Sequence, residues 1–135
     1  MDGGPYPRVV NVPGFIARQF YVAGSLRNTD DGWELQAHNP MGDGVLVGVG
    51  RLSVDGRDIA PAAVTARRSG SDEIYRAGDV TRARPIAIRK GDRVTLHVAG
   101  EPLATGSHKL EVELHEANIG VLRLSLSDRL AGDTI

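Results

Sequence analysis

Histidines and carboxylates are the residues of this chain with the widest chemical repertoire, and one stretch brings them close together in sequence. Residues 105–116 read TGSHKLEVELHE, so that His108 and His115 lie in a segment where glutamates alternate with apolar side chains. Imidazole and carboxylate groups at short range can bind a metal ion or exchange protons. Whether these can do so depends on the directions in which their side chains point.

The alternation in this stretch predicts a β-strand, whose successive side chains point to opposite faces. His108 and His115 are seven positions apart and therefore lie on opposite faces, so they cannot chelate one ion unless a bulge intervenes. His108 shares its face with apolar residues and should point toward the core, where its ring nitrogens need hydrogen-bond partners or serve to orient a loop. His115 shares its face with charged residues, which indicates a solvated or interface position.

The other two histidines, His38 and His97, have parities that place them away from the core, and a cross-strand pair of His97 and His115 would be a weak metal site without fixed carboxylates. The chain has no cysteine, which excludes disulfides, thiolate zinc sites and a cysteine nucleophile. It also excludes a blue-copper site, despite the cupredoxin-like stretch KGDRVTL at residues 90–96. We therefore expect no metal ligands in this chain.

Other catalytic patterns are also missing. The stretch GVLVGVG at residues 44–50 resembles a phosphate-binding loop only in composition, because no helix is expected to follow it. There is no Gly-x-Ser-x-Gly motif, and the adjacent carboxylates at residues 30–31 and 72–73 fall in expected turns, where acidic residues commonly cap and solvate the backbone. We therefore assign no catalytic residue from these patterns.

Period-two alternation recurs from about residue 19 to residue 126 and predicts an all-β chain, a single antiparallel β-sandwich or jelly-roll-like domain. Residues 1–14 contain three prolines and lack alternation, so we expect an N-terminal arm, followed by the sandwich at 15–130 and a C-terminal tail at 131–135. The expected strands are 19–26, 33–38, 45–54, 63–67, 73–77, 85–89, 93–99, 108–116 and 118–125.

Composition limits the functional classes. The 16 basic and 17 acidic residues are interspersed, which is not the pattern of a nucleic-acid-binding protein. The longest apolar runs are far too short to span a membrane, and the N-terminus lacks the features of a signal peptide. We therefore expect a cytoplasmic protein that binds neither nucleic acid nor membrane.

The expected strand at residues 45–54 departs from the alternation of a half-exposed sheet. It carries apolar residues on both faces, so its second face needs a cover. Two interpretations remain open: a loop of the same chain lies over a central strand, or the face is buried at a subunit interface.

The order of several short motifs resembles the β subunit of bacterial C-glycoside deglycosidases. These motifs are Gly-Phe at 14–15, Asn-Pro-Met-Gly-Asp-Gly at 39–44 before an apolar strand, Leu-Ser-Val-Asp-Gly at 52–56 before Arg-Asp-Ile at 57–59, and Leu-Ala-Thr-Gly-Ser-His at 103–108. The resemblance covers residues 14–128. The family's loop carries tyrosines and an arginine before its glycine, where this chain has Met41, Gly42 and Asp43; the Gly-x-His element ending at His108 is kept.

The resemblance implies a β-sandwich subunit that is inactive alone and belongs to a hetero-oligomer. Its partner would be a larger barrel-type α subunit resembling sugar-phosphate isomerases and holding a divalent metal, typically manganese, with no cofactor in this chain. Such a complex cleaves the carbon–carbon bond between a 3-oxo sugar and its aromatic aglycone. Candidates for the substrate edge or the subunit interface are then Asn39, Pro40, Met41, Asp43, Gly44, Val45, Val47 and His108.

Two other classes of protein remain open beside this one. A stand-alone small-ligand or carbohydrate-binding β-sandwich module should present a concave aromatic surface, and the chain has only one tryptophan, three tyrosines and two phenylalanines. A self-sufficient metalloenzyme of jelly-roll type would need three converging ligands, which the strand parities do not supply.

Overall fold

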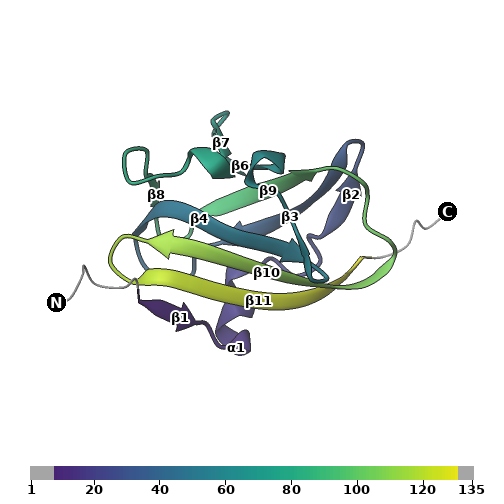
Figure 1. Ribbon diagram of the computed structural model, residues 1–135, viewed down its shortest axis with the longest axis horizontal. Helices are drawn as coiled ribbons and strands as arrows, with labels where there is room; N and C mark the ends of the chain where they lie inside the picture. Colours follow the sequence, from purple (N-terminus) through teal and green to yellow (C-terminus); the bar gives the residue numbers. More distant parts are fainter. Residues whose placement is uncertain (1–7, 131–135) are drawn as a thin grey trace.

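The structure, a computed structural model, describes residues 8–130 as two β-sheets with little helix (Figure 1). The larger sheet contains β1 (Val9–Asn11), β4 (Gly44–Val54), β5 (Arg57–Asp58), β8 (Ile86–Ile88), β10 (Gly106–Glu116) and β11 (Gly120–Leu130). The smaller sheet contains β2 (Arg27–Thr29), β3 (Gly32–His38), β6 (Val64–Arg68), β7 (Ile74–Arg76) and β9 (Arg93–Ala99). The helical elements are α1 (Gly14–Ala17), η1 (Arg18–Phe20), η2 (Pro61–Ala63) and η3 (Ala77–Asp79). The prediction of an all-β fold is confirmed.

The strand order is β1-β11-β10-β4-β5 in the larger sheet, with β8 also paired to β4, and β2-β3-β9-β6-β7 in the smaller sheet. Every pair is antiparallel except β1 with β11. The three 11-residue strands β4, β10 and β11 lie side by side at the centre of the larger sheet. These strands set the length of the molecule, because the remaining strands have seven residues or fewer.

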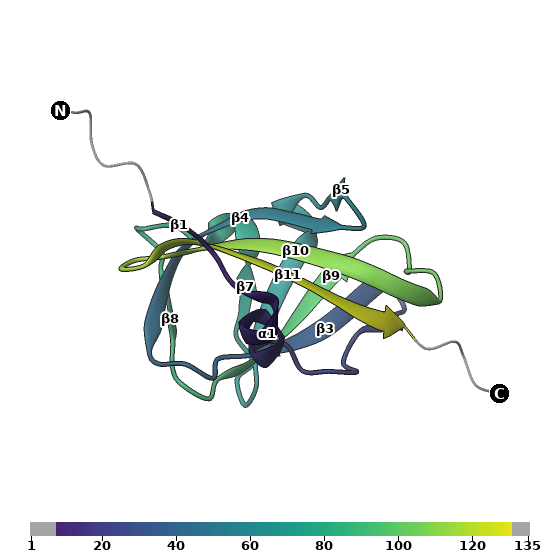
Figure 2. The ribbon, with the colours of Figure 1, turned by 90° about the horizontal axis from the view of Figure 1, so that it is seen from below.

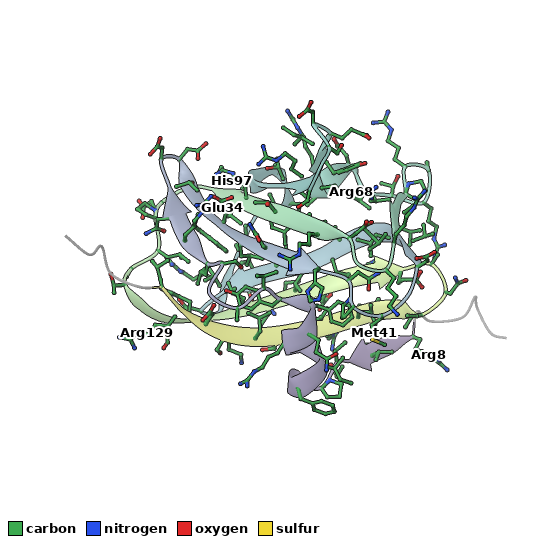
Figure 3. The ribbon with its side chains drawn as sticks, turned by 180° about the vertical axis from the view of Figure 1, so that it is seen from behind. Arg8, Glu34, Met41, Arg68, His97 and Arg129 are labelled. Atoms are coloured by element: carbon green, nitrogen blue, oxygen red, sulfur yellow. The ribbon has the colours of Figure 1, made fainter. Side chains whose placement is uncertain are left out.

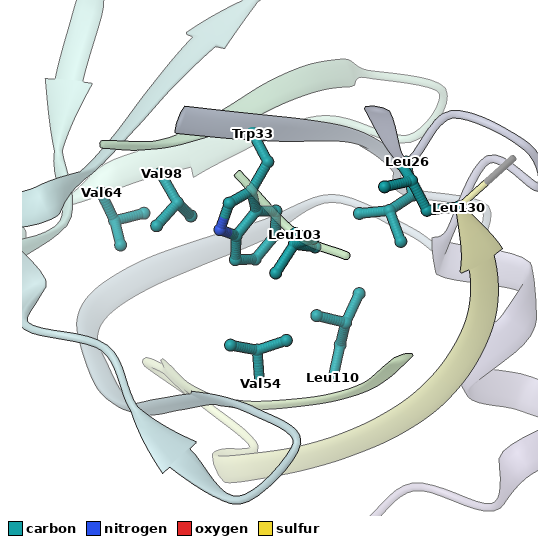
Figure 4. Close-up of a cluster of buried hydrophobic side chains, with 8 residues drawn as sticks. All are labelled: Leu26, Trp33, Val54, Val64, Val98, Leu103, Leu110 and Leu130. Carbon is teal, nitrogen blue, oxygen red and sulfur yellow. The ribbon is translucent and has the colours of Figure 1, made fainter. Parts of the chain in front are cut away.

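One apolar core lies between the two sheets (Figure 4). It forms because every second residue of a strand points to the same face. Burying each large aliphatic or aromatic side chain contributes about 1.5–3 kcal/mol, so the shared core holds the sheets together. Its buried members are Leu26, Trp33, Val54, Val64, Val98, Leu103, Leu110 and Leu130.

The expected N-terminal arm is wrong for the part of it that the structure describes. Val9–Asn11 forms β1, which runs parallel to β11 and pairs Val9 with Val121. Backbone bonds from Val121 N to Arg8 O at 2.7 Å and from Val12 N to Arg123 O at 2.9 Å flank the pairing. The segment is ordered because it satisfies the outer edge of β11. Residues 1–7, and the expected tail at 131–135, lie outside the described residues.

The strand expected at residues 19–26 is also wrong. The chain forms η1 there and touches β3 through one isolated bridge between Tyr21 and Ala37. The segment turns around the Tyr21 hydroxyl, which donates to the Asp128 carboxylate and accepts a bond from Leu26 N at 3.2 Å. Burial and the neighbouring Asp128 carboxylate raise the pKa of Tyr21 to about 12, so the phenol remains a donor.

No helix in residues 8–130 is long and apolar enough to cross a membrane.

Candidate functional site

His108 is buried, as the alternation of its strand predicted. Its Nδ1 lies 2.6 Å from Asp55 Oδ2 and its Nε2 lies 2.6 Å from the Ala104 carbonyl oxygen. Both partners accept hydrogen bonds, so only the protonated ring, whose two nitrogens both donate, satisfies both contacts at once. The hydrogen bond to Ala104 and the one to Asp55 raise the pKa of His108, and the imidazolium lowers the pKa of Asp55.

Asp55 is held in place by a two-residue hairpin turn between β4 and β5. Asp55 has a φ of 51° and Gly56 a φ of 81°, which is the left-handed backbone of a type I′ turn. Asp55 Oδ1 accepts a bond from Lys109 N at 2.8 Å, and Asp55 N donates to Lys109 O at 2.8 Å. His108 therefore ties the β4–β5 turn to the start of β10. In its protonated form, with both nitrogens donating, His108 has no lone pair for a base or a metal ion.

The 39–44 loop connects β3 to β4 and is built around Asn39. The Asn39 side chain donates from Nδ2 to Gly42 O at 2.8 Å and accepts a bond from Met41 N at 3.2 Å. The Asn39 backbone is paired on both sides with the β8–β9 turn, through Asp92 O at 3.0 Å and Gly91 N at 2.7 Å. An Asx turn of this kind fixes a loop from within.

In the rest of this loop, Asp43 fixes the backbone and Met41 is exposed. Asp43 Oδ1 accepts a bond from Lys90 N at 2.9 Å, which gives the loop another tie to the β8–β9 turn. The side chain of Met41 is 59% exposed, and the adjoining Pro40 is half-buried. The loop thus presents a flexible apolar side chain on a fixed frame, which suits contact with another molecule.

Glu116 closes this end of the larger sheet and was missed by the sequence analysis. Its carboxylate accepts bonds from Val45 N at 2.9 Å, Asn118 N at 2.6 Å and Ile119 N at 2.8 Å. Burial would raise the pKa of Glu116, but these backbone hydrogen bonds outweigh burial and lower it. Glu116 shares the inward parity of Leu114, and that signal could have identified it. A side chain on Gly44 would come within 3.3 Å of Glu116 Oε2.

The structure does not bring His108 and the 39–44 loop together. The loop leads into β4 at the end that pairs with β8, whereas His108 lies near β5 at the other end, and Figure 2 shows β8 and β5 far apart. His108 and Glu116 are eight residues apart on β10, which is roughly 27 Å at about 3.4 Å per residue. Asn39, Pro40, Met41, Asp43, Gly44 and Val45 form one region, and His108 belongs to another.

Side chains of β10 lie over part of β4, a contact that neither interpretation of the sequence named, while residues 44–50 stay half-buried. The pairing of β10 with β4 shifts register twice, so the simple alternation along β4 is broken. Side chains on Gly48 and Gly50 would lie 3.1 Å from His115 Nδ1 and 2.9 Å from Glu113 Oε2. His115 and Glu113 of β10 therefore lie over the glycines of β4, and Val47 is half-buried at the second register shift, between Leu46 and Gly48.

The remaining histidines do not converge on a common site. His97 Nε2 lies 2.8 Å from Asp31 Oδ1 and 3.2 Å from Thr29 Oγ1 on the smaller sheet (Figure 3). His115 belongs to the larger sheet, so the two cannot form a cross-strand pair. His38 has a buried Nδ1 with no hydrogen-bond partner in residues 8–130. The described part of the chain contains no group of three or more His, Asp or Glu side chains placed to hold a metal ion.

Fold and site together define an all-β domain in which residues 8–130 carry loops fixed by hydrogen bonds and several side-chain ion pairs. The chain belongs to the family described as hydroxymethylglutaryl-CoA reductase, N-terminal domain, which matches residues 16–131. The match includes both sheets apart from β1. No curated protein matches the chain.

Proposed function

We propose that this protein is a non-catalytic subunit that completes a catalytic partner. The specific assignment is the β subunit of a C-glycoside deglycosidase, a lyase that breaks the carbon–carbon bond between a 3-oxo sugar and its aglycone. The chemistry would lie on a barrel-type α subunit that holds a divalent metal such as manganese. The observation that carries this proposal is the 39–44 loop, which projects the exposed Met41 from a frame of hydrogen bonds.

The geometry of the loop suits an edge of a partner's pocket. Its backbone is tied to the β8–β9 turn and its far end to Glu116, so binding would cost little ordering entropy. Loops on rigid β scaffolds are a common place for contacts with ligands and partners. In this proposal the loop shapes the pocket, and His108 holds the scaffold at the opposite end.

The family match favours a second candidate. In this alternative the chain is an all-β domain that accompanies the catalytic domain of a hydroxymethylglutaryl-CoA reductase. Both candidates assign an accessory role to the chain, and they differ in the identity of the catalytic partner.

Co-purification distinguishes the two candidates. The tagged chain would be co-expressed in separate experiments with a barrel-type deglycosidase α subunit and with a hydroxymethylglutaryl-CoA reductase catalytic domain, and each mixture analysed by size-exclusion chromatography with light scattering. We expect a stable complex with the barrel subunit. A complex with the reductase domain alone would favour the second candidate, and a monomer in both mixtures would contradict the accessory role.

Substitutions in the 39–44 loop should change substrate binding and leave chemistry almost intact. For Met41→Ala and Asp43→Ala in the reconstituted complex, we expect a higher KM or an altered substrate preference and a kcat within about tenfold, because a rim contact is worth on the order of 1 kcal/mol. Steady-state kinetics on several 3-oxo-C-glycosides provide the measurement. A loss of kcat greater than a hundredfold would assign the loop a role in catalysis.

A further inference from the structure

Both sheets carry paired and unpaired cations on their outer faces, and Lys109 and Arg129 of the larger sheet make no ion pair with another residue in the range 8–130. On the larger sheet, Arg51 is paired with Asp58 at 2.7 Å and Arg123 with Glu113 at 3.1 Å. The half of the smaller sheet near β2 is similar, because Arg27 is paired with Glu34 at 2.6 Å and His97 with Asp31 at 2.8 Å. Glu34 and His97 lie together in this half in Figure 3.

The other half of the smaller sheet carries three arginines that lack such partners. Arg93, Arg67 and Arg76 come from the adjacent strands β9, β6 and β7, and all three are exposed. The register pairs Arg67 with Thr95, which is two positions from Arg93, and it pairs Arg76 with Thr65, which is two positions from Arg67. The three side chains therefore lie on the same face, the outward one. None of them makes an ion pair or a side-chain hydrogen bond with another residue in the range 8–130. We call this set the arginine stripe.

The spacing within the arginine stripe follows from sheet geometry. Arg67 lies diagonally across from Arg93 on one side and from Arg76 on the other. Diagonal neighbours in an antiparallel pair are about 7–8 Å apart. The side chains that point to one face of an extended strand repeat at about 6.8 Å, so the stripe matches a strand with alternating carboxylates.

The acidic residues that directly precede β7 and β9 each accept a hydrogen bond. Glu73 Oε2 accepts a bond from the Tyr75 hydroxyl at 3.3 Å, and Asp92 Oδ2 accepts one from Arg89 N at 2.8 Å. An apolar side chain lies beside the arginine stripe, because Ile74 lies opposite Arg67 and is 65% exposed. The outward residues of β6, β7 and β9 include no phenylalanine, tyrosine or tryptophan, so there is no platform for stacking nucleic-acid bases.

We infer that the arginine stripe is a docking surface for an acidic protein segment, an extended strand or loop with carboxylates at alternate positions. The choice of the catalytic partner as the source of this segment rests on the proposed function. The chemistry of the surface does not, because it follows from unpaired guanidinium groups at a regular spacing. Each exposed charge pair is weak on its own, so the three together give a weak affinity that falls with salt.

Fluorescence anisotropy with a labelled ten-residue Glu-Thr peptide tests this inference on the full chain. We expect saturable binding at low salt, loss of most binding at 0.5 M NaCl, and an approximately tenfold or greater rise in Kd for the triple variant R67Q/R76Q/R93Q. R51Q is the matched control, because Arg51 is also exposed and lies on the other sheet. We expect its Kd to equal that of the wild type. The three single variants repeat the comparison if the triple variant unfolds.

Three outcomes would overturn the inference: no binding of the Glu-Thr peptide, equal binding of a Gln-Thr peptide, or a triple variant that binds as tightly as the wild type. Tighter binding of a ten-nucleotide poly-dT strand would also overturn it and would indicate a nucleic-acid surface. The peptide assay contains no catalytic partner, so its result is separate from that of the co-purification experiment. A failure of one can therefore be distinguished from a failure of the other.

Discussion

Replacing Gly32 with alanine is expected to destabilise the protein strongly. The added Cβ would lie 1.9 Å from the Val98 carbonyl oxygen and 2.9 Å from the Val98 carbonyl carbon. These are backbone atoms of β9, which is paired with β3 at this position, so neither can move without breaking the pairing. Overpacking in a fixed site costs about 1–3 kcal/mol, and a clash with backbone should reach or exceed the upper value.

Urea unfolding followed by Trp33 fluorescence measures this loss, because Trp33 is the only tryptophan and lies in the core next to Gly32. Small domains are stable by about 5–15 kcal/mol, so a loss of about 3 kcal/mol would shift the midpoint clearly. Gly42→Ala is the control, because a Cβ there would meet nothing within 4 Å. Equal stabilities of the two variants would show that the pairing of β3 with β9 is not as close as described.

His108→Ala is the second substitution with a large expected effect. It removes both donors from a buried imidazolium and leaves the Asp55 and Ala104 acceptors without them. Hydrogen bonds to charged groups contribute about 1.5–3 kcal/mol, so we expect a loss of about 2–3 kcal/mol in the free energy of unfolding. Catalysis in a reconstituted complex should change only as far as assembly does.

The stability that His108→Ala removes should depend on pH in a defined direction. The raised pKa of His108 means that its contribution is fully present below its ordinary pKa of 6.5 and disappears as the pH rises through the raised value. The lowered pKa of Asp55 means that its contribution is fully present above 3.8 and disappears as the pH falls through the lowered value. The stability difference between wild type and variant should therefore be largest at about pH 4–6.5 and shrink at higher pH.

Asp55→Asn tests what the carboxylate charge contributes to stability separately from what the turn contributes. Asparagine tolerates the positive φ of this position and can still accept the bond from Lys109 N, but it lacks the carboxylate charge. We expect this variant to lose less stability than His108→Ala and to show a weaker pH dependence. Denaturant unfolding at several pH values measures both, and a difference between wild type and His108→Ala that stays constant from pH 5 to pH 9 would contradict the ion pair.

The parts of the fold that the sequence predicted are those in which one face of a strand is buried. Trp33 and Leu110 lie in the core because their neighbours alternate, and the strand expected at residues 93–99 matches β9. The inward direction of His108 followed from the same rule. These positions depend only on local parity, which a sequence displays directly.

The errors arise where distant segments decide the local structure. Val9–Asn11 became a strand because β11, more than 100 residues later, offers a free edge. Tyr21 interrupted an expected strand because its hydroxyl meets Asp128, 107 positions away. The contacts of His115 and Glu113 with two glycines of β4 depended on the register of the two strands, which shifts twice. Local periodicity contains none of this information.

Reconstitution of activity tests the central claim most directly. Turnover of a 3-oxo-C-glucoside would be measured with this chain alone, with a barrel-type α subunit alone, and with both together in the presence of manganese. The proposed accessory role predicts no turnover by this chain, little by the barrel subunit, and full activity only for the mixture. Turnover by this chain alone, or a barrel subunit whose full activity does not depend on it, would contradict the proposal.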